Sequence, residues 1–87
     1  MRDTMQQFMR KFEQLNGVEA KVVLEHRLFD GQVFHCDELK IINDDEKIGV
    51  MIKNKNIFIY KPNVKVAEEK NGAYIISDGR MTISIYK

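Results

Sequence analysis

The hydrophobic residues of this chain change their spacing once, at Asn16-Gly17, and this change constrains the fold more than any other feature. Before it, apolar residues recur at steps of three and four and form one stripe along a helix: Met5, Phe8, Met9, Phe12 and Leu15. Beyond it, apolar residues recur at every second position and β-branched residues become frequent, as in strands. We therefore predict one helix over residues 4–16, lying as a lid over a small core, followed by strands.

Alternation of apolar and polar residues predicts a series of short strands after Gly17. Their ranges are 18–25, 28–36, 39–42, 48–52, 57–60, 64–66, 73–77 and 80–86. Gly31 interrupts the second of these strands, which predicts a bulge or a sharp bend and a sheet that curls on itself. The polar residues 53–56 have the length and composition of a hairpin loop.

Asp78-Gly79 stands between two alternating runs and is typical of a tight hairpin turn whose central residues both have positive φ. The polar residues 68–71 form a joint before this hairpin. The predicted fold is therefore mainly β with one N-terminal α-helix. We expect a single domain with a helix at residues 4–16, the strands of a small antiparallel barrel at 18–67 and an additional β-hairpin at 72–87.

Length and composition restrict the class of protein. The chain has 87 residues and a mass of 10.2 kDa, which is one domain, and its 44% apolar and 31% charged residues are typical of a soluble globule. No apolar stretch approaches the roughly 20 residues that cross a bilayer. The N-terminus lacks the continuous apolar core of a signal peptide, and the single Cys36 cannot form an internal disulfide, so we expect a cytoplasmic protein without a membrane partner.

Two segments resemble the motifs of a known family. Gly31-Gln32-Val33, then Asp37, then Leu39-Lys40-Ile41-Ile42, resemble the first Sm motif as it occurs in bacterial Hfq. Phe58-Ile59-Tyr60-Lys61, followed by a valine-containing strand, resemble the second motif, in which a Tyr-Lys-His turn joins the last two strands. The resemblance covers about residues 5–67 and implies an Sm-like (SH3-like) small barrel.

In that family, identical subunits form a ring that binds RNA without catalysis. The resemblance implies a homo-oligomer in which the strand at 57–60 of one subunit pairs with the strand at 64–66 of the next. The added hairpin at residues 72–87 departs from the family and would cover the edge that the ring needs, which would leave a monomer or a dimer.

The family's uridine pocket transfers to this chain only in part. Asp37 and Tyr60-Lys61 match it. Glu38 stands where the family has an amide, Leu39 where it has an aromatic residue and Pro62 where it has a histidine. A leucine offers no π-face to a base, and base–aromatic stacking contributes about 1–3 kcal/mol per base, so these departures predict a weaker uridine pocket than the family has.

The net charge is only +1, so the protein as a whole does not attract anions, and any anion site must be formed by a local group of basic residues. Basic and acidic residues are nevertheless separated along the chain. The residues that we predict to contact single-stranded RNA are Tyr60, Lys61, Lys53, Lys55, Lys65, Arg10 and Lys11. The four central lysines lie between residues 48 and 67, a stretch without acidic residues in which Phe58 and Tyr60 are interleaved. The alternative is that these lysines protect edge strands, that Phe58 belongs to the core and that the helix cations are an ordinary solvated surface.

The chemistry of the remaining polar residues favours a protein that is not an enzyme. His35 and Cys36 are neighbours on a strand and point to opposite faces, so they cannot chelate one ion, and we predict neither a metal nor a cofactor. Residues 44–46 lack the spacing of a calcium loop and read as a solvated turn. The alternative function is a protein-interaction or structural module on the same barrel, with the hairpin at 72–87 as its contact surface.

Overall fold

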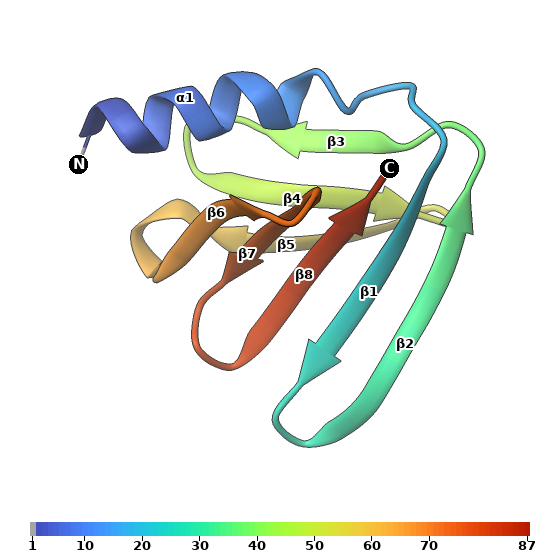
Figure 1. The fold of residues 1–87 in the computed structure, drawn as a ribbon. Coiled ribbons are helices and arrows are strands. Elements are labelled where there is room, and N and C mark those ends of the chain that lie inside the picture. Colours follow the sequence, from blue (N-terminus) through green and yellow to red (C-terminus); the bar gives the residue numbers. More distant parts are fainter. Residues whose placement is uncertain (1) are drawn as a thin grey trace.

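The computed structural model describes residues 2–87, apart from the side chains of residues 2–5 and 30. One helix precedes the strands (Figure 1). The elements are α1 (Arg2–Glu13), β1 (Ala20–His26), β2 (Phe29–Cys36), β3 (Lys40–Asn43), β4 (Lys47–Ile52), β5 (Lys55–Tyr60), the short 3-10 helix η1 (Lys61–Asn63), β6 (Val66–Lys70), β7 (Ala73–Ser77) and β8 (Met81–Tyr86). The prediction of a mainly β fold with one N-terminal helix is confirmed.

The strands form two antiparallel sheets and not one closed barrel. The larger sheet has five strands in the order β2-β1-β8-β7-β6, and the smaller has three in the order β3-β4-β5. No ladder joins the two sheets within residues 2–87, because the chain passes from β2 to β3 and from β5 to β6 without continued pairing. The closed cylinder expected from the Sm-like pattern is therefore absent from this chain. Helix α1 contacts β3 of one sheet and β6 of the other, and so covers the gap between them on one side (Figure 1).

The core lies between the two sheets and beneath α1. Phe8, Phe12 and Leu15 are buried there, so the apolar stripe is the lid over the core that its spacing predicted. The α-helix itself ends at Glu13 and not at residue 16. The next residues form a tighter turn, in which the N–H of Leu15 donates to Phe12 O at 3.1 Å, and Gly17 follows with a left-handed φ of 83°.

The C-terminal hairpin is part of the core and not an addition to it. Strand β8 lies in the middle of the larger sheet, between β1 and β7. Ile83 and Ile85 are completely buried, and Ile85 is the cross-strand partner of Val22, more than sixty residues earlier in the chain. The hairpin thus supplies the centre of the larger sheet, and its use as the contact surface of an interaction module stays a prediction.

Two short turns differ from their predicted form because asparagine carries the left-handed conformation. Lys53 and Asn54 alone connect β4 to β5, with φ of 50° and 66°, where a four-residue loop was expected. Asn71 and Gly72, with φ of 53° and 82°, connect β6 to β7 in the same way. Consequently β6 runs through most of the segment at 68–71 that was expected to be a polar joint.

The hairpin predicted at Asp78-Gly79 is present, but its turn is displaced by one residue. The N–H of Asp78 donates to Met81 O, so Gly79 and Arg80 are the central residues, and only Gly79 has a positive φ. The Asp78 carboxylate instead accepts the N–H groups of Arg80 and Met81, each at 2.8 Å. The bulge predicted at Gly31 is also present. Between the pairs Leu24↔Gln32 and His26↔Phe29, β2 has one residue more than β1, so residues 30 and 31 together oppose Glu25.

Candidate nucleic-acid interface

The outer face of the smaller sheet carries a close pair of aromatic side chains, Phe58 and Tyr60. Among the residues that the structure describes, it is the only such pair that contains a predicted site residue. Alternation directs Ile48, Val50 and Ile52 of β4 into the core. Ile59 of β5 is also buried, so its neighbours Phe58 and Tyr60 face the opposite way. Phe58 is not a member of the core cluster, which removes the alternative interpretation of this residue.

We call this surface the platform and define it by the outward side chains of the three strands. Its members are Lys40, Ile42, Lys47, Met51, Phe58 and Tyr60. The Phe58 and Tyr60 rings meet edge to face, with centroids 5.2 Å apart and planes at 83°. The Lys47 ammonium lies 5.1 Å from the centroid of Phe58. The platform thus combines two aromatic rings with a cation at contact distance.

Gly49 is the residue that brings β4 close to the aromatic strand. It is the cross-strand partner of Phe58, and a Cβ atom built on it would meet Ile57 O and lie 2.5 Å from Phe58 Cα. No side chain fits there without moving the backbone. Pairing an aromatic residue with a glycine on the neighbouring strand lets the ring cover the backbone that the glycine leaves bare.

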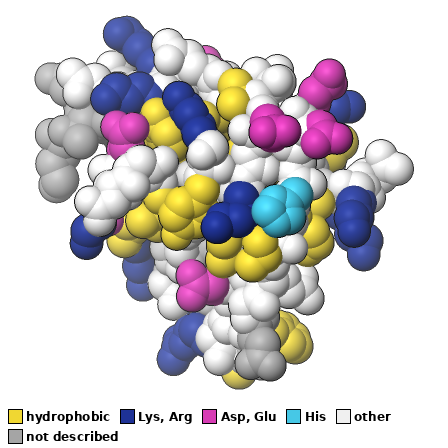
Figure 2. All heavy atoms as spheres, turned by 45° about the vertical axis from the view of Figure 1, so that its right-hand side comes forward, with side chains coloured by type: hydrophobic (Ala, Val, Ile, Leu, Met, Phe, Trp, Pro, Cys, Tyr) yellow, Lys and Arg dark blue, Asp and Glu magenta, His cyan; other side chains and the backbone are white. Residues whose placement is uncertain are grey.

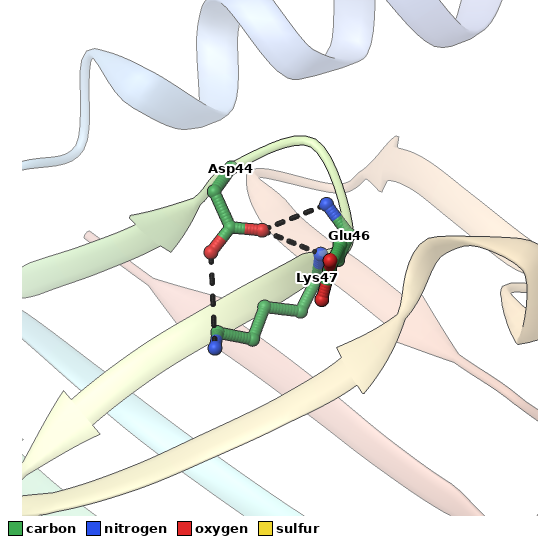
Figure 3. A network of polar contacts seen from close by, with 3 residues as sticks. All are labelled: Asp44, Glu46 and Lys47. Atoms are coloured by element: carbon green, nitrogen blue, oxygen red, sulfur yellow. Dashed lines mark hydrogen bonds and ion pairs between the residues drawn. The ribbon is translucent and has the colours of Figure 1, made fainter.

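A charged turn borders the platform at the Tyr60 end. The Asp44 carboxylate accepts the N–H groups of Glu46 and Lys47, both at 2.8 Å, and its second oxygen lies 3.8 Å from Lys47 Nζ (Figure 3). These backbone hydrogen bonds, from Glu46 and then Lys47, hold the pKa of Asp44 below its ordinary value, and the charges of Lys47 and Lys61 act in the same direction. The carboxylate is therefore ionised and partly neutralises the lysines beside it.

The lysines predicted to act together are separated by the length of β5. Lys53 and Lys55 lie at the β4–β5 turn, whereas Tyr60 and Lys61 lie at the other end of this six-residue strand. At about 3.4 Å per residue, that separation is about 17 Å. Lys53 lies over another ring, with its ammonium 5.8 Å from the centroid of Phe34. An extended strand of nucleic acid spans such a distance, but a single nucleotide does not.

The other predicted cations lie away from the platform. The side chain of Lys65 lies beside Gly79 in the β7–β8 turn. There it lines a pocket with Asp78 and Arg80. Lys11 on α1 pairs with Glu69 of β6 at 3.5 Å. Arg10 is exposed on the same helix. These three residues do not join Tyr60 and Lys61 in one site.

The residues of the Sm-like motif are also dispersed. Leu39 is completely buried in the core, so it has no face to offer a ligand. Asp37 lines a cleft with Lys21 and Tyr86, and Glu38 lines another near Met51 and Lys53; neither cleft includes Tyr60 or Lys61. The motif does not assemble a pocket for a base in this chain.

No protein-family model, no curated protein and no solved structure matches this chain.

Neither a reactive cysteine nor a group of metal ligands is formed by the described residues. Burial, and next to it the charge of Asp37, raises the pKa of the Cys36 thiol, so the thiol is protonated and a poor nucleophile. Among the residues that the structure describes, no three histidine, cysteine or acidic side chains are grouped as metal ligands. Nor does this part of the chain contain a helix long and apolar enough to span a membrane.

Sequence reasoning missed four members of the platform, namely Lys40, Ile42, Lys47 and Met51. The signal that could have found them is the register of the β4–β5 hairpin. A two-residue turn at Lys53-Asn54 pairs Met51 with Asn56 and Lys47 with Tyr60, so these side chains share the face of the aromatic residues.

Proposed function

We propose that the protein binds single-stranded RNA on the platform, without catalysis. The observation that carries the proposal is the pair of Phe58 and Tyr60 rings on an outer sheet face, with the Lys47 ammonium 5.1 Å from the Phe58 centroid. The core is complete without these rings, so their burial in the core does not explain them. Flat aromatic side chains on a sheet surface are a common way in which proteins stack unpaired bases.

The platform supports binding that tolerates different base sequences. Stacking needs only the π-face that every base has, and the described clefts around the Sm-like motif do not bring polar groups and Tyr60 together. The lysines at both ends of β5 suit a chain of phosphates that runs along the strand, from Lys61 to Lys53 and Lys55. Because Asp44 offsets part of the charge at the Tyr60 end, we expect modest affinity and a clear dependence on salt.

Binding of a fluorescently labelled single-stranded RNA, measured by anisotropy between about 50 and 200 mM salt, tests the proposal. Tyr60→Leu removes an exposed ring and is expected to weaken binding about 5- to 150-fold, which corresponds to the 1–3 kcal/mol of one stacked base. Lys61→Ala is expected to lower the slope of log K against log salt by about 0.7, the value for one phosphate of a single strand.

Tyr86→Leu is the matched control for Tyr60→Leu. Tyr86 is exposed to a similar degree, 40% against 51% for Tyr60, and it lies near a cation, with Lys21 Nζ 5.0 Å from its ring centroid, as Phe58 beside Tyr60 lies near Lys47. It belongs to the larger sheet, away from the platform. The proposal fails if RNA binding is absent at low salt, or if Tyr60→Leu and Tyr86→Leu weaken it equally.

The ring implied by the Sm-like resemblance remains a prediction. Strands β5 and β6 are end strands of their sheets, and each pairs with one neighbour in the chain. Pairing between β5 of one copy and β6 of the next would give a ring of six or seven subunits, whose mass light scattering would report. The charges and the proline at these two edges oppose that pairing.

A further inference from the structure

The two sheets have four end strands, and three of them are protected against pairing with another chain. Strand β3 has four residues and lies under α1. Strand β6 has the sequence Val-Ala-Glu-Glu-Lys and also contacts α1. Strand β5 begins with Lys55 and is followed directly by Lys61 and Pro62. Short length, charge, proline and a covering helix are the devices by which proteins block their sheet edges.

Strand β2 lacks most of these devices. It has eight residues, Phe-Asp-Gly-Gln-Val-Phe-His-Cys, with no lysine and no proline. Phe29 and Val33 are 71% and 55% exposed, and Leu28 beside them is also exposed. Figure 2 shows hydrophobic side chains across the middle of the surface on this side of the molecule, with basic side chains and a histidine among them. The bulge at Gly31 is the one protective feature that β2 retains.

The backbone of β2 also has groups that face outward. The N–H of Arg27 donates to Arg80 O, on the β8 side of β1. The N–H and C=O groups of successive residues alternate in direction along a strand, so those of Val22 point toward β2, where Phe34 is its cross-strand partner. The N–H and C=O of Phe34 point back toward β1 in the same way. The N–H and C=O of Val33 therefore point away from β1, toward the open edge. The same alternation directs the groups of His35 outward.

We propose that β2 pairs antiparallel with β2 of a second copy of this chain, on a two-fold axis at Val33. This inference goes beyond RNA binding, because it assigns a different surface to a different partner. The result is a continuous sheet of ten strands, twice the five in one copy. An antiparallel pair of identical strands is self-complementary, as a two-fold interface requires.

The side chains around the axis favour a second copy as the occupant. Val33 lies beside Val23 on the outer face of the larger sheet, so the axis joins two apolar pairs into one row of four valines. Of the eight residues of β2, only Asp30 carries a formal charge at pH 7, so pairing two copies brings little like charge together. Strand β6, by contrast, would place a glutamate of one copy against a glutamate of the other near the centre of such a pair.

The proposed register also accommodates the exposed hairpin tip. With Val33 opposite its copy, and with residues 30 and 31 together occupying one position at the bulge, Phe29 of one chain lies level with Cys36 of the other. That position adjoins a cleft of about 370 Å³ whose lining includes Phe34, Cys36 and Met51. The cleft is also lined by Glu38, Lys40 and Lys53, so the exposed ring of each copy is placed at a cleft of mixed apolar and charged lining in the other, and the two-fold axis repeats this contact.

The mass of the protein in solution, measured by light scattering over a range of concentrations without RNA, tests the proposal. We expect the wild type to reach twice the chain mass of 10.2 kDa. Val33→Glu places two carboxylates against each other at the axis and is expected to raise the dimer dissociation constant at least about tenfold. Val66→Glu is the matched control, since Val66 is an exposed valine on the opposite end strand, β6.

Circular dichroism and thermal unfolding of each variant show that it is folded. Phe29→Ser is a second variant, because Phe29 lies outside the core. The substitution removes the ring that contacts the cleft of the other copy and adds no charge at the two-fold axis. We expect it also to weaken the dimer. The proposal is overturned by a monomer at all concentrations, by a ring of six or seven subunits, or by a dimer that Val66→Glu dissociates and Val33→Glu does not. RNA binding through the platform is tested by Tyr60→Leu, and its outcome is independent of the outcome for the dimer.

Discussion

Replacing Gly49 with alanine is the sharpest test of how the smaller sheet is built. The added methyl group would meet Ile57 O and lie 2.5 Å from Phe58 Cα. Both atoms belong to the backbone of β5, so no rotation of a side chain relieves the contact. The strands must separate at the pair Gly49↔Phe58, which weakens the hairpin at the centre of the platform.

The magnitude follows from two opposing effects. Alanine restricts the unfolded chain more than glycine, which by itself stabilises a protein by about 0.4–1 kcal/mol. Overpacking against atoms that cannot move costs about 1–3 kcal/mol, and the backbone contact belongs at the upper end. We expect a net loss of about 2 kcal/mol in the free energy of unfolding, from a total of about 4–13 kcal/mol for a chain of this length. With a urea slope near 1 kcal/mol per M, the midpoint falls by about 2 M.

Gly31→Ala is the control, since it is also a glycine within a strand. The nearest atoms to its added Cβ are 3.7 Å away, an ordinary contact, and its φ is not left-handed. Equilibrium unfolding in urea should therefore show Gly31→Ala near the wild type, and Gly49→Ala well below it. Equal midpoints for the two variants, or a larger loss for Gly31→Ala, would refute the assigned approach of β4 and β5.

Two further predictions concern the turns. Gly72 has a φ of 82° and open space around it, so Gly72→Ala is expected to lose about 1–2 kcal/mol from backbone conformation alone, as thermal or urea unfolding would show; an unchanged midpoint would contradict the left-handed turn. At Asp78, the N–H of Met81, and then that of Arg80, hold the pKa of the carboxyl below its ordinary value. A lowered folded-state pKa means that this stabilisation is present above about pH 4 and is lost as the pH falls through the folded value. Asp78→Asn should therefore be less stable than the wild type at pH 7 and approach it at pH 3, with Asp45→Asn as an exposed control; a difference that does not change with pH would contradict the assignment.

The exposed turn at residues 44–46 and the platform are held together by hydrogen bonds at one end of the smaller sheet. Asp44 closes the β3–β4 turn through the N–H groups of Glu46 and Lys47, and Lys61 donates its own N–H to Glu46 O at 2.7 Å. The entry to β4 and the exit from β5 are thus held together at one point. This contact positions Tyr60 beside Lys47 and gives the proposed RNA surface a fixed geometry.

Several features of the fold follow from short-range patterns. The spacing of Phe8, Phe12 and Leu15 predicted a helical lid, and the alternation after Gly17 predicted strands. Glycine at 31 and 79 marked a bulge and a turn that the structure contains. The dipeptide Asn71-Gly72 also favours a two-residue hairpin turn, and the structure contains that turn. The charged residues before it instead led to the prediction of a polar joint at residues 68–71.

The candidate site was less accessible to prediction. Lysine and aromatic residues between 48 and 67 marked the right hairpin, yet they did not show that Lys53 and Tyr60 lie at opposite ends of β5. Nor did they show that Lys65 belongs to the β7–β8 turn. Distances along a folded chain depend on the lengths of strands and turns, and an error of two residues in one turn moves a side chain to the other end of a sheet.

The residue order by itself determined that one helix precedes a series of alternating strands and that the chain turns at Gly17 and near Gly79, because each of these depends on the backbone preferences of a few neighbouring residues. Tertiary structure alone decided that β8 pairs with β1, that the strands separate into two sheets, and that Phe58 faces outward. A period of two defines two faces of a strand but does not say which one is buried. That choice is made by burying the largest apolar surface in one core, and it involves residues that are far apart in the chain.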